Sequence, residues 1–341
     1  MHQQKTRIEW LDIAKGLSII LVVVYHTLLY LNFHEMAPAL YTKISNIMAP
    51  IRMPLFFSVS GFLAASAIRA TWPDFFRKKI WTFVWLFGVW STARWLYFRY
   101  VHANGLVPSE GSDPYQLIEM WWAPNTGIWF IWALAIFMTV TKLLSSAPRI
   151  PVIAVGTVLS ILTFGGYLPI ELFTHRNVLQ YFVFFAFGCW YGRLIAETLT
   201  ERPLPFAAGG FSAFILLLAL RSRLQPIEPG LWAFASSIAG LSWLCGMAVL
   251  MSRLKALRDV FSYFGRNTLP VYVTHVMIVA GIAGLIATLV EPSPSIGYLA
   301  APLICVTAIT LSLAIKAAAD RSGASWLYSP PVRRERAVAA A

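Results

Sequence analysis

The feature that most restricts the fold of this chain is an uncharged apolar stretch near its N-terminus. From Gly16 to Phe33, 18 residues contain no Asp, Glu, Lys or Arg, which is long enough to cross the hydrocarbon core of a bilayer as a helix. At ~100° per residue, Lys15 lies about 20° and Asp12 about 40° from the direction of His26, so the three side chains share one helix face. At ~1.5 Å per residue, Lys15 lies roughly 16 Å from His26 along the axis, which predicts a polar stripe from the membrane surface to mid-bilayer.

His26 is the only imidazole in this stretch. A charged side chain at mid-membrane costs roughly 2.5 to 3.5 kcal/mol on insertion scales, so ionisable groups there usually face a bundle interior or a wet cavity and have a function. We therefore regard His26 as a candidate functional residue. The alternative is a neutral histidine that forms a hydrogen bond to a neighbouring helix.

The composition indicates a polytopic membrane protein. Of 341 residues, 58% are hydrophobic and only 12% are charged, whereas soluble domains average ~25% charged residues. The net charge of +12 does not indicate nucleic-acid binding, because the basic residues cluster at the ends of apolar spans, where membrane topology explains them. The three cysteines, Cys189, Cys245 and Cys305, are isolated in apolar runs without metal-ligand spacing, so we expect no metal site.

Apolar runs of suitable length predict ten transmembrane helices in a single all-α membrane domain. With the N-terminus inside, 20 of the 27 Lys and Arg residues lie in inner segments and 7 in outer ones, as the positive-inside rule requires. Both termini are therefore expected in the cytoplasm. The expected spans are residues 16–33, 50–68, 80–98, 127–144, 150–166, 178–195, 205–220, 230–251, 269–289 and 297–315.

Two segments outside the spans have a distinct character. The long outer loop, residues 99–126, holds Glu119 and Trp122, and its aromatic residues either anchor the chain in the interface or line a sugar site. Residues 1–316 form the expected membrane domain. Residues 317–341 are expected to be a basic, largely disordered cytoplasmic tail beside anionic lipid.

Five patches in order along the chain resemble motifs of the acyltransferase 3 family of integral membrane O-acyltransferases, in particular its short branch similar to fucose 4-O-acetylases. One departure is that the family's Arg-x-x-Arg at the third span is here Arg77-Lys78-Lys79, followed by Ile80. The patches are Leu-Asp-Ile-Ala-Lys-Gly at 11–16 with His26 eleven residues after Lys15; Arg-Met-Pro-Leu-Phe-Phe-Ser-Val-Ser-Gly-Phe at 52–62; Gly-Ile-Trp-Phe-Ile-Trp-Ala-Leu at 127–134; Tyr-Phe-Val-Phe-Phe-Ala-Phe-Gly at 181–188; and Phe-Gly-Arg-Asn-Thr-Leu-Pro-Val-Tyr-Val-Thr-His at 264–275.

This resemblance implies transfer of an acyl group, by default acetyl, from cytoplasmic acyl-coenzyme A to a hydroxyl of an extracytoplasmic or lipid-linked carbohydrate. Neutral histidine accepts protons at physiological pH, so we expect His26 to be the general base. Ser60, at a depth expected to match that of His26, either donates a hydrogen bond to the thioester oxygen or to His26, or belongs to a Ser-Gly pair that permits close helix packing. Asp12 either holds Lys15 and helps to bind the donor, or forms a plain interfacial ion pair.

The phosphates of coenzyme A require cations or helix N-termini as partners. The resemblance makes acetyl-coenzyme A or another acyl-coenzyme A the expected co-substrate and implies donor binding by Lys15, Arg77, Lys78, Lys79, Arg266 and His275. For Lys78 and Lys79, topology signalling is an equal alternative. His275 is placed by its span on the inner side, at a depth that favours a donor-pocket or structural role. Trp129, Phe130, Trp122 and Glu119 are expected at the carbohydrate acceptor.

Two other function classes compete with the enzyme. One is a transporter or flippase of a lipid-linked sugar, in which His26 and His275 relay protons or bind solute. The other is an inactive scaffold in envelope polysaccharide assembly. In each case the expected location is the bacterial cytoplasmic membrane, with lipid as a partner; composition predicts no oligomeric state, because interior and interfacial helix faces are alike.

Overall fold

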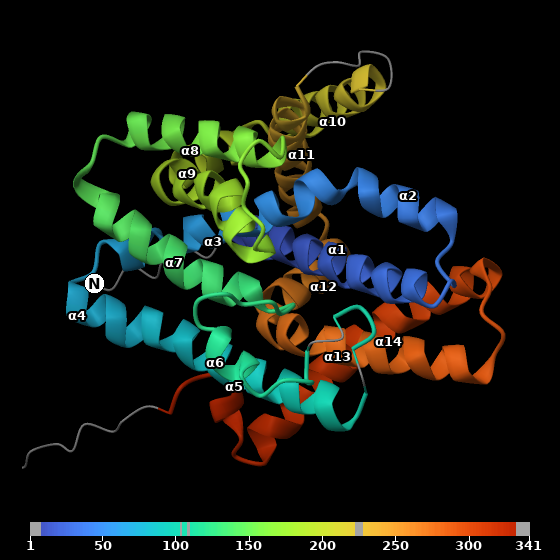
Figure 1. Cartoon of the computed structure of the whole chain (residues 1–341). Helices are drawn as coiled ribbons and strands as arrows, with labels where there is room; N and C mark the ends of the chain where they lie inside the picture. Colours follow the sequence, from blue (N-terminus) through green and yellow to red (C-terminus); the bar gives the residue numbers. More distant parts are fainter. Residues whose placement is uncertain (1–7, 103, 108–109, 222–227, 332–341) are drawn as a thin grey trace, which may run out of the picture.

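The computed structural model describes residues 8–102, 104–107, 110–221 and 228–331, and in these residues the regular structure is entirely helical (Figure 1). The helices are α1 (Glu9–Phe33), α2 (Ala39–Ile47), α3 (Ala49–Ile68), α4 (Trp72–Phe75), a π-helical turn (Phe76–Ile80), α5 (Trp81–Tyr100), α6 (Gln116–Glu119), α7 (Trp129–Leu143), α8 (Arg149–Phe164), α9 (Phe173–Glu201), α10 (Pro203–Arg221), α11 (Pro229–Ser252), α12 (Lys255–Arg266), α13 (Thr268–Leu289) and α14 (Pro294–Arg321), with 3₁₀ turns at Leu144–Ser146 and Ser325–Leu327.

The prediction of an all-α polytopic membrane protein is confirmed. Within the described residues, eight helices are long and apolar enough to cross a membrane by length and composition. Each of the ten expected spans corresponds to one helix; the two outside this group of eight are α5 and the shorter apolar α8. The count of ten crossings and the cytoplasmic location of both termini stay predictions.

Helix α1 lies at the centre of the bundle (Figure 1). It packs against α3, α11, α12, α13 and α14. Ile13, Val23 and Leu31 are fully buried, so one side of the helix packs against its neighbours along its length. Half of its apolar span is buried; among its polar side chains Ser18 and Thr27 face the interior, whereas His26 is partly exposed.

Two glycines let α3 and α9 approach at backbone distance. A Cβ added to Gly61 of α3 would stand 2.0 Å from the Phe185 carbonyl oxygen of α9, and one on Gly188 of α9 would stand 2.1 Å from that of Ser58. Small residues at such contacts are typical of membrane helix interfaces. For the Ser60–Gly61 pair, the expectation of close helix packing is therefore met by Gly61.

Helix α12 was not among the expected elements. It is amphipathic and packs across the start of α1, where a Cβ on Gly265 would stand 1.7 Å from the Asp12 carbonyl oxygen. A mean hydropathy window of spanning length misses a 12-residue helix of this kind. Its packing brings the beginning of α13 into the interior of the bundle.

The first part of the segment expected to be a disordered tail, from residue 317, is ordered in the structure. Helix α14 continues to Arg321, and the following turn docks on α5. The indole nitrogens of Trp85 and Trp90 donate hydrogen bonds to the carbonyl oxygens of Trp326 (2.8 Å) and Leu327 (2.7 Å). Buried apolar contacts and satisfied carbonyls hold this turn, so the disorder expected from residue 317 does not apply to the described residues up to 331. The domain boundary at residue 316 stays a prediction, and residues 332–341 lie outside the described part of the chain.

Candidate functional site

Two histidines from distant parts of the sequence meet in the interior of the bundle. His26 of α1 and His275 of α13 place Nδ1 and Nε2, respectively, 3.1 Å apart, with their ring planes inclined by 67°. His275 has no exposed surface, whereas His26 is only partly buried. The pair therefore has one enclosed member and one member that a substrate can reach.

Backbone carbonyls determine which ring nitrogens carry protons. Nδ1 of His26 lies 2.9 Å from the Val22 carbonyl oxygen, and Nδ1 of His275 lies 2.8 Å from that of Val271. A carbonyl oxygen can only accept a hydrogen bond, so both Nδ1 atoms are the donors in the neutral rings. Nε2 of His275 then accepts from Nδ1–H of His26, and Nε2 of His26 keeps its lone pair for a substrate proton.

The expected depth of His275 was wrong. Its position seven residues after the start of α13 suggested the inner side, away from His26. Because α12 packs across α1 and leads α13 into the bundle, His275 instead reaches the level of His26 and contacts it. This contact replaces the predicted donor-pocket position with a position directly behind the candidate base.

Tyr272, one turn before His275, connects this pair to α7. Its hydroxyl donates to the Gly127 carbonyl oxygen at 3.1 Å and accepts from the Phe130 backbone N–H at 3.2 Å. Trp129 and Phe130 are both buried. The ring of Phe130 lies 5.6 Å from that of Tyr272 and 4.3 Å from that of Phe56, centroid to centroid, whereas Trp129 packs on Tyr181 and Phe173. Of the two expected acceptor residues, Phe130 is therefore the one next to the histidine site.

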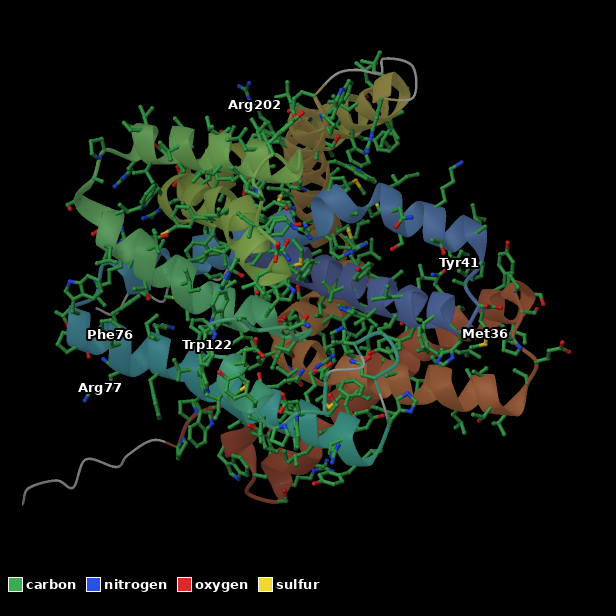
Figure 2. All side chains as sticks on the ribbon, in the orientation of Figure 1. Met36, Tyr41, Phe76, Arg77, Trp122 and Arg202 are labelled. Atoms are coloured by element: carbon green, nitrogen blue, oxygen red, sulfur yellow. The ribbon has the colours of Figure 1, made fainter. Side chains whose placement is uncertain are left out.

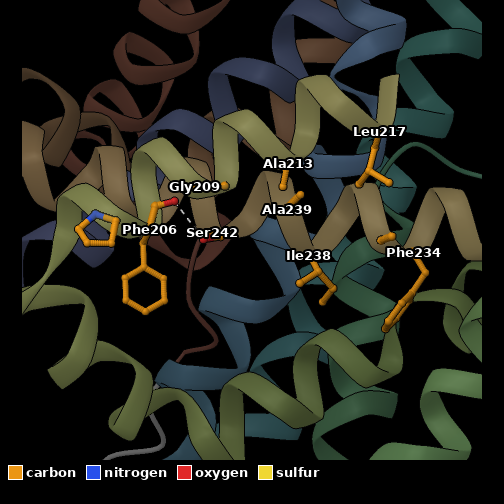
Figure 3. A pocket seen from close by; sticks show the side chains of 11 residues that line it. Phe206, Gly209, Ala213, Leu217, Phe234, Ile238, Ala239 and Ser242 are labelled. Carbon is orange, nitrogen blue, oxygen red and sulfur yellow. Dashed lines mark hydrogen bonds between the residues drawn. The ribbon is translucent and has the colours of Figure 1, made fainter. Parts of the chain in front are cut away.

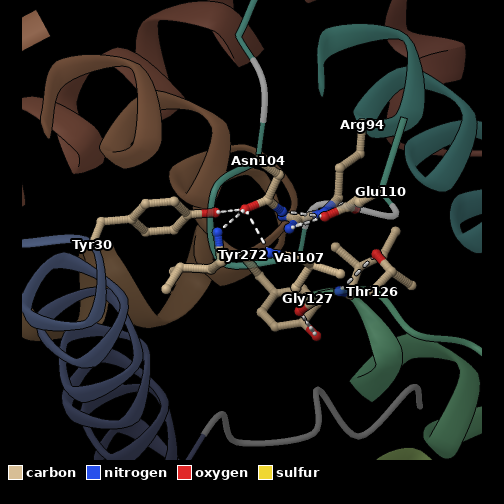
Figure 4. A network of polar contacts seen from close by, with 10 residues as sticks. Tyr30, Arg94, Asn104, Val107, Glu110, Thr126, Gly127 and Tyr272 are labelled. Atoms are coloured by element: carbon tan, nitrogen blue, oxygen red, sulfur yellow. Dashed lines mark hydrogen bonds and ion pairs between the residues drawn. The ribbon is translucent and has the colours of Figure 1, made fainter. Parts of the chain in front are cut away.

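A second buried polar group, Arg94 of α5, lies beside this connection (Figure 4). Its Nε and Nη2 donate to the two carboxylate oxygens of Glu110 at 2.5 and 2.9 Å. Asn104 donates to Glu110 at 2.5 Å and accepts from the Tyr30 hydroxyl at 3.0 Å. The network connects the loop of residues 99–126 to α1 and α5. It was not predicted from the sequence.

Arg52 of α3 is another buried cation. Its guanidinium lies 4.1 Å from the ring centroid of Tyr25, the neighbour of His26, and Nη2 donates to the Ser45 carbonyl oxygen at 3.1 Å. Arg52 and Arg94 were both visible as ionisable residues inside or at the end of an apolar span. The same rule that selected His26 would have selected both of them.

Ser60 does not contact His26. Its hydroxyl donates to the Phe56 carbonyl oxygen of its own helix at 2.7 Å. The polar side chain of α3 that lies over the ring of Tyr25 is Arg52, about two helical turns before Ser60. The role and the depth expected for Ser60 stay predictions.

Asp12 lies near the start of α1 and forms an ion pair with Lys15 at 3.8 Å. At ~1.5 Å per residue, it is about 21 Å from His26 along the axis. Arg266 ends α12, which packs on this same part of α1. Asp12, Lys15 and Arg266 thus belong to one neighbourhood, remote from the histidine pair.

The remaining expected donor cations, Arg77, Lys78 and Lys79, lie exposed in the π-helical turn before α5 (Figure 2). Arg77 and Lys78 pair with Asp74 at 3.5 and 3.0 Å. The hydrogen bond from Lys78 lowers the pKa of Asp74. This carboxylate therefore keeps its charge, and its pairing with the two cations, over a wider range of acidic pH.

Glu119 is the last residue of α6, and Trp122 follows three residues later. Half of the Trp122 side chain is exposed, and its carbonyl oxygen interacts with His175 Nε2 at 2.7 Å. Glu119 is partly buried. The contacts of these two residues do not link them to the histidine pair.

Two grooves formed by the described residues have no histidine in their lining. One of about 610 Å³ lies along α10 and α11 and is apolar apart from Ser242, whose hydroxyl donates to the Phe206 carbonyl oxygen at 3.0 Å (Figure 3). The other, of about 660 Å³, has a mixed lining that includes Asn32, Lys43 and Arg221. No group of three or more His, Cys, Asp or Glu residues in the described ranges is arranged to hold a metal ion.

Comparison with known proteins gives one family and one relative. The family described as "Acyltransferase domain", of the acyltransferase 3 type, matches residues 8–317. Inner membrane protein YcfT of Escherichia coli (strain K12) is 23% identical over 356 residues, which cover 94% of this chain and 96% of the relative. No solved structure matches.

Proposed function

This chain belongs to the acyltransferase 3 family, and on that premise we propose that it transfers an acyl group from acyl-coenzyme A to a carbohydrate hydroxyl, with His26 as the general base. The acyl group is acetyl by default. The related Escherichia coli protein is an inner membrane protein, and this relation together with the polytopic fold supports a site in the bacterial cytoplasmic membrane. Donor and acceptor then meet within the bilayer, near His26.

The observation that carries the proposal is the contact between His26 and His275. The Val22 carbonyl and Nε2 of His275 both attract the Nδ1–H of His26, which fixes the tautomer whose Nε2 accepts a proton. A base must have its lone pair free and its ring held in one orientation. His275 supplies that orientation and stabilises the imidazolium formed during the reaction.

The reaction then proceeds by direct transfer. The acceptor hydroxyl oxygen attacks the thioester carbonyl carbon, its proton passes to Nε2 of His26, and the carbonyl electron pair moves onto oxygen. Collapse of this intermediate restores the C=O bond and breaks the C–S bond, whose electron pair leaves with sulfur. The thiolate takes the proton from His26, which yields free coenzyme A and the ester.

Donor and acceptor approach this base from opposite sides. Lys15 and Arg266, which share the inner part of α1 and α12, are candidates for the coenzyme A phosphates, and Arg77, Lys78 and Lys79 form a second cationic group. Phe130, which contacts Tyr272, and its neighbour Trp129 border the acceptor. Glu119 and Trp122 are outer-loop residues that a longer saccharide would contact.

The test is release of coenzyme A thiol by the purified protein with acetyl-coenzyme A and a panel of oligosaccharide acceptors. We expect His26→Ala to lower kcat by about 10²- to 10⁴-fold, the usual contribution of general base catalysis. His34→Ala is the matched control, because burial and the nearby His102 lower the pKa of His34 and removal of this neutral ring changes no charge at pH 7.5.

Three outcomes are informative. Loss of coenzyme A release in a folded His26→Ala variant, together with normal release by His34→Ala, supports both the acyltransferase activity and the role of His26 as its base. Equal release by wild type and His26→Ala contradicts the role of His26. Absence of acyl-coenzyme A consumption with every acceptor, together with solute flux in liposomes, would favour the transporter.

A further inference from the structure

We propose that Arg94 is a catalytic residue that donates a hydrogen bond from Nη1 to the oxyanion formed during acyl transfer. This inference rests on the proposed function and adds to it a group that contacts the reacting carbonyl. The observation behind it is the set of hydrogen bonds that the buried guanidinium makes and does not make.

The guanidinium is enclosed and only partly satisfied. Arg94 is 3% exposed, and Nε and Nη2 are both bound to Glu110. Nη1 is buried and makes no hydrogen bond of accepted geometry within the described residues. The Tyr30 hydroxyl also interacts with the Arg94 side chain, but it donates its own hydrogen bond to Asn104 Oδ1. Buried donors are nearly always paired in folded proteins, so a buried unpaired guanidinium nitrogen points to an oxygen that arrives with the substrate.

The position of this nitrogen suits the reacting carbonyl. A Cβ added to Gly127 would stand 3.1 Å from Nη1, and the Gly127 carbonyl accepts the Tyr272 hydroxyl at 3.1 Å. The ring of Tyr272 lies 6.2 Å from that of His275, centroid to centroid, and His275 contacts His26. Gly127 and Tyr272 thus connect the Arg94 guanidinium to the histidine pair, and no side chain on Gly127 stands between them.

The charge of the network favours an oxyanion over a permanently charged ligand. Glu110 compensates the positive charge of Arg94 through two parallel hydrogen bonds, so the pair has little attraction for a stable anion at a distance. A fixed N–H dipole still stabilises negative charge that develops within hydrogen-bond reach. The contacts to Glu110, and through it to Asn104 and Tyr30, hold this dipole in place before the reaction.

In the reaction, the acceptor oxygen forms a bond to the thioester carbon while its proton moves to His26, and the carbonyl oxygen becomes negatively charged. Nη1–H of Arg94 donates to this oxygen and keeps its own proton. When the C–S bond breaks, the negative charge leaves the oxygen and the hydrogen bond weakens. Arg94 is thus unchanged after each turnover.

The experiment uses the full-length protein in detergent, with coenzyme A release as the readout and thermal unfolding as the check of folding. Arg94→Gln removes the guanidinium. Gly127→Ala keeps the guanidinium and places a methyl group against Nη1. Gly88→Ala of α5 is the matched control, because its Cβ would stand 3.1 Å from the Trp121 side chain, outside the proposed site.

We expect kcat to fall by about 10²- to 10³-fold in Arg94→Gln, as for removal of one oxyanion donor, and at least tenfold in Gly127→Ala. KM for acyl-coenzyme A should change less than threefold, and Gly88→Ala should behave as wild type. Restoration of Arg94→Ala activity by added methylguanidine would support a chemical rather than a structural role.

Two results would overturn the inference separately from the proposed function. A folded Gly127→Ala or Arg94→Gln variant with kcat within threefold of wild type would remove Arg94 from the chemistry while the wild type still released coenzyme A. A rise in KM without loss of kcat would place Arg94 in ground-state binding. A wild type that consumed no acyl-coenzyme A would overturn both proposals.

Discussion

At the scale of single residues, the interior of this protein contains ionisable side chains that form partnerships across the bundle. His26 contacts His275, and Arg94 contacts Glu110. A buried charge without a partner is strongly unfavourable in a membrane. Each partnership therefore restricts which helices are able to pack together and where the chemistry takes place.

One prediction at this scale concerns His275. Replacement by Ala removes one of the two acceptors of the His26 Nδ1–H, leaves the Val22 carbonyl as the other, and makes the orientation of the base less firm. We expect kcat to fall about 10- to 100-fold, less than in His26→Ala, because the base itself is retained. Steady-state coenzyme A release measures the effect, and His34→Ala again serves as the control. A loss as large as that in His26→Ala would indicate that His275 itself transfers the proton.

At the scale of elements, glycines decide how closely helices pack. Gly61 and Gly188 bring α3 and α9 to backbone contact, and Gly16 and Gly265 do so for α1 and α12. The second contact has a functional consequence, because it directs α13 toward His26. A side chain at either contact would separate two backbones that are otherwise in van der Waals contact.

Gly61→Ala tests this packing. Its Cβ would stand 2.0 Å from the Phe185 carbonyl oxygen, whereas a Cβ on Gly209 of α10 has no atom within 4 Å. Overpacking of this kind typically costs about 1–3 kcal/mol, so we expect a lower Tm in detergent for Gly61→Ala and an unchanged or raised Tm for Gly209→Ala. Equal melting temperatures of the two variants would contradict the close approach of α3 and α9.

At the scale of the whole molecule, the charge distribution predicts the orientation in the membrane. Of the 27 Lys and Arg residues, 20 lie in segments that face the cytoplasm if ten spans begin with the N-terminus inside. Such a cation bias sets topology during insertion. The docking of the turn after α14 on α5 places the end of the described chain beside the inner half of α5 in this arrangement.

Single-cysteine labelling tests this orientation. In a background in which Cys189, Cys245 and Cys305 are replaced by Ala, we expect an impermeant maleimide to label Tyr167→Cys and Glu291→Cys in intact spheroplasts. Ser146→Cys and Ser322→Cys should react only after the membrane is permeabilised. All four positions are exposed on the protein surface. A cysteine that the maleimide does not label in intact spheroplasts therefore lies on the cytoplasmic side of the membrane. Labelling of Ser322→Cys in intact spheroplasts would contradict a cytoplasmic C-terminus.

The sequence by itself determined the elements that the bilayer selects. Length, hydropathy and charge predicted each of the long apolar helices and selected His26 as a candidate functional residue, because a membrane core requires long apolar segments and penalises a polar group within it. The motif order likewise indicated the family that the match over residues 8–317 then confirmed.

Only the tertiary structure decided which side chains meet. The pairing of residues 249 positions apart in His26–His275, the Arg94–Glu110–Asn104 network, and the docked turn after α14 all depend on long-range packing. Depth along a span did not predict the level of His275, since the amphipathic α12 is too short and too polar for a span-based prediction. Helix packing is set by the shapes of whole faces in three dimensions, and a linear hydropathy pattern contains no information about the partner of each face.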